Sequence, residues 1–243
     1  MESRPLAPCF GAEVVGLDLS GPLDPDTVPR LRALFDERLV LLFRDQRLSP
    51  EAHIAFSRSF GTLEIHVLDE YHASRHREIF VLSNVGPDGR PNHVHPDRGT
   101  LVWHTDASWQ RRPARATLLY ADAVPRAGGH TLFADTLSAF EALSAEDRAR
   151  FSTLRAIHDL NVSREKAGYG PMRPGQRAKV PAVEHPVVRT HRPTGRRGIY
   201  LGSHAHRIVG LSDLESAGLL ERLMAHTTEP RSSTTTPGVR ATS

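Results

Sequence analysis

The chain has 243 residues, 39% of them hydrophobic and 24% charged, which fits one globular domain with a single core. The formal net charge is only +3, and paired arginines such as Arg111 and Arg112 lack interleaved aromatic residues, so no nucleic-acid partner is predicted. A single cysteine, Cys9, excludes an internal disulfide and a cysteine-based zinc site. No apolar run suits a signal peptide or a membrane span, so the sequence predicts a cytoplasmic protein without a membrane partner.

Two strands and two helices are predicted in the first sixty residues. Residues 13–19 alternate apolar and polar side chains as a short strand does, and residues 24–38 carry apolar side chains at helical spacing. The compact apolar run at residues 40–43 suits a buried strand. Ser49 and Pro50 then provide an N-cap and a first-turn proline, which predict a helix that ends near residue 61.

Short strand-like runs dominate the rest of the chain, separated by loops that contain glycine and proline. They lie at residues 79–82, 101–104, 117–121, 131–134, 185–190 and 198–201. Helices are predicted at residues 137–143, 145–154 and 213–226, and a mobile loop is predicted at residues 166–179. Many short strands with few helices predict a mostly β fold, a sandwich or a barrel, with the helices packed outside.

The last thirteen residues differ in composition from the rest of the chain. Residues 231–243 consist of serine, threonine, proline, glycine and arginine, with Val239 and Ala241 as the only apolar side chains. Such a segment cannot bury a core. Taken alone, this composition predicts one domain at residues 1–230, followed by a disordered tail.

One short motif, Trp103-His104-Thr105-Asp106, carries the chemistry of a metal site. On a strand, residues two apart project from the same face, so His104 and Asp106 can bind one metal ion. Two histidines and one carboxylate leave three positions open on Fe(II), enough for a bidentate 2-oxo acid and dioxygen. A lone His-x-Asp triplet, in a chain with 14 histidines, more often marks ordinary surface or turn residues.

An ordered series of segments from about residue 10 to residue 230 resembles the taurine and 2,4-dichlorophenoxyacetate dioxygenase family. The segments include Phe10-Gly11-Ala12-Glu13, Val40-Leu41-Leu42-Phe43, Phe60-Gly61-Thr62-Leu63, Trp103-His104-Thr105-Asp106, Gly128-Gly129-His130-Thr131, His185-Pro186-Val187-Val188 and Ile208-Val209-Gly210-Leu211. Each segment is a weak signal alone, whereas the ordered series is specific. The chain is therefore identified as similar to this family of dioxygenases.

The resemblance implies a fold, a reaction and a set of site residues. The fold would be a double-stranded β-helix, which is a jelly-roll or cupin-like barrel. The enzyme would use Fe(II), 2-oxoglutarate and O2 to hydroxylate a small anionic organic acid, an aryloxyalkanoate, a sulfonate or a sulfate ester, and would release succinate and CO2. His104 and Asp106 would be iron ligands, and Thr131 would hydrogen-bond 2-oxoglutarate. His66 matches a position near the substrate, although a polar residue at a strand end explains it equally well. Homo-oligomers are common in the family.

Three features that the family carries near its C-terminus do not occur in this sequence. They are a Trp-x-x-Gly-Asp strand, an Asp-Asn-Arg…His segment with the second iron histidine, and an arginine that binds the 2-oxoglutarate carboxylate. We therefore expect a barrel that is incomplete at the C-terminus and an iron site without its second histidine. Codons can be chosen for residues 231–243 so that another reading frame spells VQYHYTWRPGDL, which resembles the expected strand. The sequence thus predicts a truncated chain, produced by a frameshift after about Pro230.

Alternatives to an intact dioxygenase follow from this gap. A remnant protein with at most metal or ligand binding is one, and a cupin-type zinc or manganese protein is another. Replacement of the missing ligand by His204 or His206 is not expected, because their segment resembles ordinary family sequence before the true ligand. His93 and His95, two apart in a loop, are better explained as channel or solvated residues.

Overall fold

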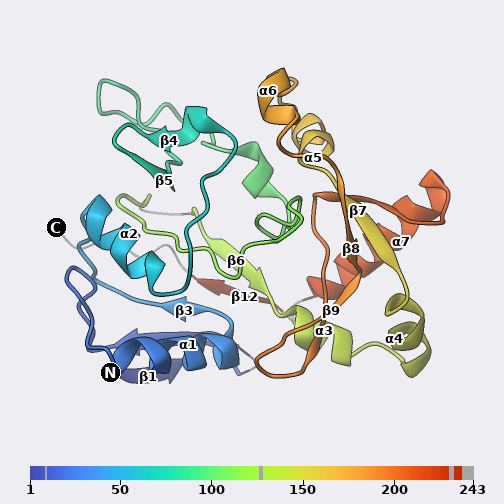
Figure 1. Cartoon of the computed structure of the whole chain (residues 1–243), viewed down its shortest axis with the longest axis horizontal. Helices are drawn as coiled ribbons and strands as arrows, with labels where there is room; N and C mark the ends of the chain where they lie inside the picture. Colours follow the sequence, from blue (N-terminus) through green and yellow to red (C-terminus); the bar gives the residue numbers. More distant parts are fainter. Residues whose placement is uncertain (9, 126–127, 230–232, 237–243) are drawn as a thin grey trace.

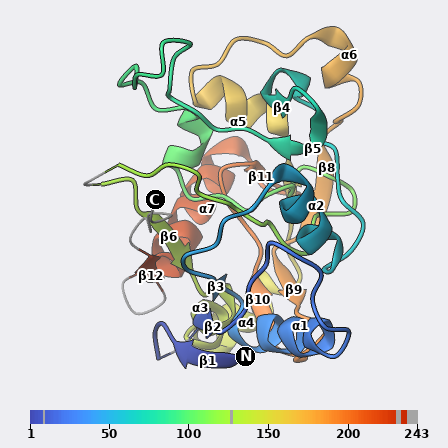
Figure 2. The ribbon, with the colours of Figure 1, turned by 90° about the vertical axis from the view of Figure 1, so that its left-hand side faces the viewer.

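A computed structural model of the chain describes residues 1–8, 10–125, 128–229 and 233–236 (Figure 1). The expectation about Cys9 lies outside these residues. Short strands form five small sheets, and helices flank them (Figures 1 and 2). Within the described ranges no helix has the length and apolar character needed to cross a membrane.

The N-terminal part forms a three-stranded sheet covered by two helices. Its strands are β1 (Glu2–Pro5), β2 (Ala12–Val15) and β3 (Leu41–Leu42), and its helices are α1 (Thr27–Arg38) and α2 (Pro50–Arg58). β2 pairs antiparallel with β1 and parallel with β3. The Ser49 side chain accepts the backbone N–H of Ala52 at 3.1 Å and so caps α2. Both predicted helices are confirmed.

The middle of the chain contains few regular elements. They are η1 (Asp69–Tyr71), β4 (His72–Ala73), β5 (His76–Phe80) and η2 (Arg98–Leu101). The strands predicted at residues 101–104 and 117–121 are wrong, because neither segment belongs to a strand. Leu101 is 63% exposed and Leu119 is 72% exposed, so the apolar pattern there does not mark a buried strand.

The C-terminal part holds the largest core. Its strands are β7 (Arg155–His158), β8 (Val183–Pro186), β9 (Val188–Thr190), β10 (Arg197–Ile199) and β11 (Ala205–Ile208). Its helices are α3 (Thr136–Glu141), α4 (Ala145–Phe151), α5 (Leu160–Lys166), α6 (Pro174–Arg177) and α7 (Asp213–Thr227). β7 lies between β11 and β8, and β9 pairs with β10. Apolar side chains from α3, α4, α7 and these strands fill the core around the fully buried Phe151. The segment predicted to be a loop at residues 166–179 contains α6.

The predicted tail contains a strand. Ser233–Thr236 form β12, which pairs antiparallel with β6 (Thr131–Ala134), with Thr236 opposite Thr131 (Figures 1 and 2). The structure thus has a strand at four residues of the predicted tail, and pairing through backbone groups does not require apolar side chains. The other residues of the predicted tail lie outside the described ranges.

Candidate active site

The segment that carries His104 and Asp106 has no regular secondary structure before it turns, and it is not the strand that the sequence predicts. Asp106 begins a turn in which Ala107 has a φ of 54°. The Thr105 hydroxyl donates to the carbonyl of Leu201 at 2.8 Å, and the Ser203 N–H donates to the carbonyl of Trp103 at 2.9 Å. These hydrogen bonds fix the motif against the chain that connects β10 to β11.

Gly202 allows this close approach. Its φ is +149°, and a Cβ atom there would lie 2.8 Å from both the Cα of His104 and the backbone nitrogen of Thr105. Real Cβ contacts do not become that short, so a residue with a side chain would push the motif away. The absence of a side chain at Gly202 therefore sets the position of His104.

His104 and Asp106 present their donor atoms to one another. The His104 Nε2 lies 3.1 Å from the Asp106 Oδ1, and the His104 Nδ1 lies 2.9 Å from the carbonyl oxygen of Val102. Because a carbonyl oxygen only accepts, Nδ1 carries the proton and donates a hydrogen bond to the Val102 carbonyl, and Nε2 keeps its lone pair in the neutral ring. This is the tautomer in which Nε2 can bind a metal.

The two side chains also stabilise each other's charged forms. The hydrogen bond to Asp106 raises the pKa of His104 against the opposing effect of burial. The hydrogen bond from His104 lowers the pKa of Asp106, with a further contribution from the Thr117 hydroxyl. In the protonated ring, Nε2 donates a hydrogen bond to Asp106. A divalent cation would replace that proton, because an imidazole nitrogen and a carboxylate oxygen suit a first-row ion such as Fe(II).

The pair provides two protein donors. Within the part of the chain that the structure describes, no group of three or more His, Cys, Asp or Glu side chains is arranged to hold a metal ion. His104 and Asp106 therefore fit two of the three positions of a facial triad.

His204 lies beside the pair, a position that was not predicted from the sequence. Its ring is edge-on to that of His104, with 6.4 Å between the ring centroids, and its Nδ1 lies 2.7 Å from the Ser163 hydroxyl of α5. Burial, followed by the charge of His104, lowers the pKa of His204 to about 4. The feature that could have located His204 is its position directly after Gly202 and Ser203, whose backbone contacts the motif.

His66 lies within electrostatic range of Asp106. Its ring packs edge-on against Phe80 and Trp109, at centroid distances of 4.7 and 5.4 Å, and its Nδ1 accepts the N–H of Leu68 at 3.1 Å. Burial lowers the pKa of His66 to about 4, while the charge of Asp106 acts in the opposite direction. The imidazole is therefore a neutral group held in one orientation.

The other residues singled out in the sequence lie in separate places. Thr131 is the first residue of β6, and its side chain is exposed. His93 and His95 lie in an exposed loop, where the Nδ1 of His95 accepts the N–H of Asp97 at 3.3 Å. Of the predicted site residues, His104 and Asp106 are those in direct contact.

Comparison with known proteins identifies the family of this chain. Residues 2–237 match the family described as taurine catabolism dioxygenase TauD, TfdA family, so the match extends past the domain boundary predicted at residue 230. The chain belongs to this family of α-ketoglutarate-dependent dioxygenases.

Two relatives and one solved structure illustrate the similarity. The chain is 36% identical over 235 residues to the α-ketoglutarate-dependent 2,4-dichlorophenoxyacetate dioxygenase of Cupriavidus pinatubonensis, covering 93% of this chain and 82% of that one. It is 35% identical over 239 residues to the (S)-phenoxypropionate/α-ketoglutarate dioxygenase of Sphingobium herbicidovorans, covering 93% and 79%. The crystal structure of AAD-2 with Mn(II) and N-oxalylglycine superposes with a TM-score of 0.86 at 32% identity, covering 98% and 85%.

Proposed function

We propose that this chain is built as an Fe(II)- and 2-oxoglutarate-dependent dioxygenase that hydroxylates a small organic acid and releases succinate and CO2. The observation that carries the proposal is the His104–Asp106 pair, with 3.1 Å between Nε2 and Oδ1 and with Nδ1 bound to the carbonyl of Val102. We further infer that the sheets belong to a double-stranded β-helix, as the similarity to AAD-2 supports. A cytoplasmic location and homo-oligomers remain part of the proposal.

Each residue has a distinct role in this proposal. His104 and Asp106 hold the ion. The hydrogen bond from Nδ1 of His104 to the carbonyl of Val102 favours the tautomer in which Nε2 carries no proton. The bound ion, together with 2-oxoglutarate, supplies the oxidising chemistry. Thr131 donates a hydrogen bond to the distal carboxylate of 2-oxoglutarate. His66, neutral and fixed by Leu68, contacts the substrate.

An aryloxyalkanoate is the substrate class that we favour, ahead of a sulfonate or a sulfate ester. The two relatives described above are named for 2,4-dichlorophenoxyacetate and (S)-phenoxypropionate, and both match more than nine-tenths of this chain. Packing of His66 against Trp109 and Phe80 adds aromatic surface within electrostatic range of Asp106, which suits an aromatic substrate.

Succinate release tests the proposal. Purified chain is incubated with Fe(II), 2-oxoglutarate and O2, and with 2,4-dichlorophenoxyacetate or taurine, and succinate is measured. We expect succinate to require 2-oxoglutarate, to rise more with the aryloxyalkanoate than with taurine, and to disappear in Asp106→Ala. Succinate release that is unchanged in Asp106→Ala would overturn the assignment of the pair.

A second candidate is a remnant of such an enzyme that no longer turns over. It is favoured by one observation, that only two donors converge within the described residues. Two protein ligands hold Fe(II) less tightly than three. Anaerobic Fe(II) titration with and without 2-oxoglutarate separates the candidates: one tight site strengthened by 2-oxoglutarate supports the enzyme, and absence of binding supports the remnant.

A further inference from the structure

A cavity of about 870 Å³ lies apart from the His104–Asp106 pair. Its lining comes from the segment before η1, from β5, from the turn after Trp109, and from α6 with the residues that lead to β8. Neither His104 nor Asp106 lines it, although His66 does. This volume is within the range of small-molecule binding sites.

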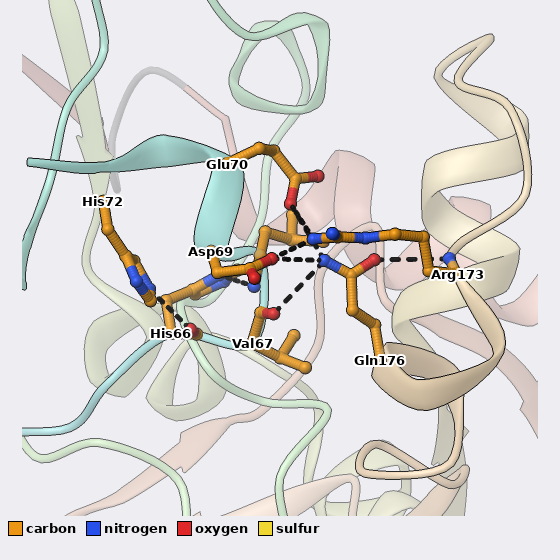
Figure 3. A network of polar contacts seen from close by, with 8 residues as sticks. His66, Val67, Asp69, Glu70, His72, Arg173 and Gln176 are labelled. Atoms are coloured by element: carbon orange, nitrogen blue, oxygen red, sulfur yellow. Dashed lines mark hydrogen bonds and ion pairs between the residues drawn. The ribbon is translucent and has the colours of Figure 1, made fainter. Parts of the chain in front are cut away.

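One wall of the cavity is cross-linked by hydrogen bonds (Figure 3). The Gln176 side-chain nitrogen donates to Asp69 at 2.9 Å, to Glu70 at 2.8 Å and to the carbonyl of Val67 at 3.4 Å. The Gln176 side-chain oxygen accepts the N–H of Arg173, whose guanidinium pairs with Asp69 and Glu70. Gln176 is only 8% exposed, so this network, which we call the clasp, ties α6 to η1 at a partly desolvated position.

The inner surface of the cavity is apolar and aromatic. Trp109 and Val180, which both line it, are 4% and 6% exposed and belong to one buried cluster. The His66 ring packs edge-on against Trp109 at 5.4 Å. A flat apolar body would meet the edge of this cluster and the aliphatic side chain of Ile65, which also lines the cavity and is 42% exposed.

The exposed lining is cationic. Arg77, Arg111 and Lys179 line the cavity with exposed side chains, and the structure records no ion pair for any of them within the described residues. The acidic residue in the lining, Asp69, is already paired with Arg173. The free side chains around the cavity therefore carry an excess of positive charge.

From this combination we propose that the cavity binds a small organic anion that has an apolar or aromatic body and at least two negative charges. Buried apolar surface holds the body, while Arg77, Arg111 and Lys179 pair with the acidic groups. The clasp keeps the wall in place before the ligand arrives, which reduces the ordering cost of binding. Neither His104 nor Asp106 lines the cavity, so binding here does not depend on dioxygenase activity, although the lining shares His66 with the proposed substrate contacts.

Titration calorimetry of the full, metal-free chain with trimesate, an aromatic tricarboxylate, tests the proposal. The neutral triol analogue serves as a matched ligand without charge. We expect trimesate to bind, the triol not to bind detectably, and the double variant Arg111→Gln/Lys179→Gln to lose at least about tenfold in affinity. Arg30→Gln, an exposed arginine of α1 that does not line the cavity, is the control variant and should bind like the parent.

Two further measurements distinguish this site from the iron site and from a folding defect. His104→Ala should leave trimesate binding unchanged, because His104 does not line the cavity. The single variants Arg111→Gln and Lys179→Gln alter exposed side chains and should each show an intermediate loss with an unchanged circular dichroism spectrum. The proposal is overturned if trimesate does not bind, if the double variant binds as Arg30→Gln does, or if His104→Ala abolishes binding.

Discussion

Gly202 lies so close to His104 that a Cβ atom on the glycine would be 2.8 Å from the Cα of the histidine. We therefore expect Gly202→Ala to displace the motif that presents His104 and Asp106. Overpacking of this kind costs about 1–3 kcal/mol. The free energy of unfolding, measured in urea, should fall by this order, and Mn(II) should bind more weakly to the folded variant.

Gly61 provides a matched control for that change. Its φ is +147°, close to the +149° of Gly202, but nothing lies within 4 Å of a Cβ built on it. Gly61→Ala therefore adds a similar backbone strain without the collision. If it weakens Mn(II) binding as much as Gly202→Ala does, contact with His104 is not the cause.

Asp106→Asn should weaken metal binding by the His104–Asp106 pair, and it should also change the pKa of His104 in the metal-free protein. The hydrogen bond to Asp106 is the largest cause of the raised pKa of His104, so a neutral amide should let that pKa fall. Imidazole chemical shifts followed by NMR in the metal-free protein measure this change. Mn(II) affinity should drop at the same time, because one anionic donor is lost. Asp122→Asn, at an exposed loop residue, should change neither quantity.

His158 should make the folded state less stable as the pH falls. Burial lowers its pKa from the ordinary 6.5 to about 3, and within the described residues its buried Nε2 has no hydrogen-bond partner. Between pH 6.5 and 3 the unfolded chain therefore binds a proton that the folded chain does not. Stability decreases in this window by about 1.4 kcal/mol per pH unit for one such group.

Urea unfolding between pH 4 and pH 6 in His158→Phe measures that contribution. The slope of the unfolding free energy against pH should become smaller by the contribution of up to one bound proton. Loss of the hydrogen bond to Ser108 lowers the free energy of unfolding at all pH values and does not change this slope. His93→Phe, at an exposed loop position, should keep the parent slope. Equal slopes in the two variants would contradict the assignment to His158.

The clasp should depend more on Gln176 than on Arg173. Gln176 is 8% exposed, and Gln176→Leu removes the hydrogen bonds from its amide to Asp69 and Glu70, each worth about 0.5–1.5 kcal/mol. Arg173 is largely exposed, so its ion pairs with Asp69 and Glu70 are screened by water and Arg173→Gln should change stability little. Urea unfolding of both variants compares them. A larger loss in Arg173→Gln would contradict this ranking.

Local signals in the sequence predicted α1, α2, α3, α4 and α7, whereas α5 and α6 were not predicted. Ser49 caps α2 as expected, and Ser212 caps α7 through a capping box with Glu215. Strand predictions were less successful, because an apolar run such as residues 117–121 forms a strand only when a partner edge lies beside it. The pairing that defines a sheet is made by residues far apart in the chain.

The candidate site shows the same contrast between local signals, which the sequence carries, and contacts between distant residues, which it does not. The family resemblance singled out His104 and Asp106, and the structure places their donor atoms together. It could not indicate that His204 lies beside His104, because that proximity depends on the contact between Gly202 and the motif backbone. The expectation that the motif lies on a strand was wrong, although the irregular segment still brings the two side chains to within 3.1 Å of one another.

His66 belongs to two neighbourhoods at once. It lines the cavity that carries Arg77, Arg111 and Lys179, and it lies within electrostatic range of Asp106. One imidazole is therefore shared by the cavity and the surroundings of the proposed metal site. A ligand that shifts this ring from the cavity side changes the environment of the metal ligand. Thermodynamic linkage then requires reciprocity: the factor by which the anion alters metal affinity equals the factor by which the metal alters anion affinity.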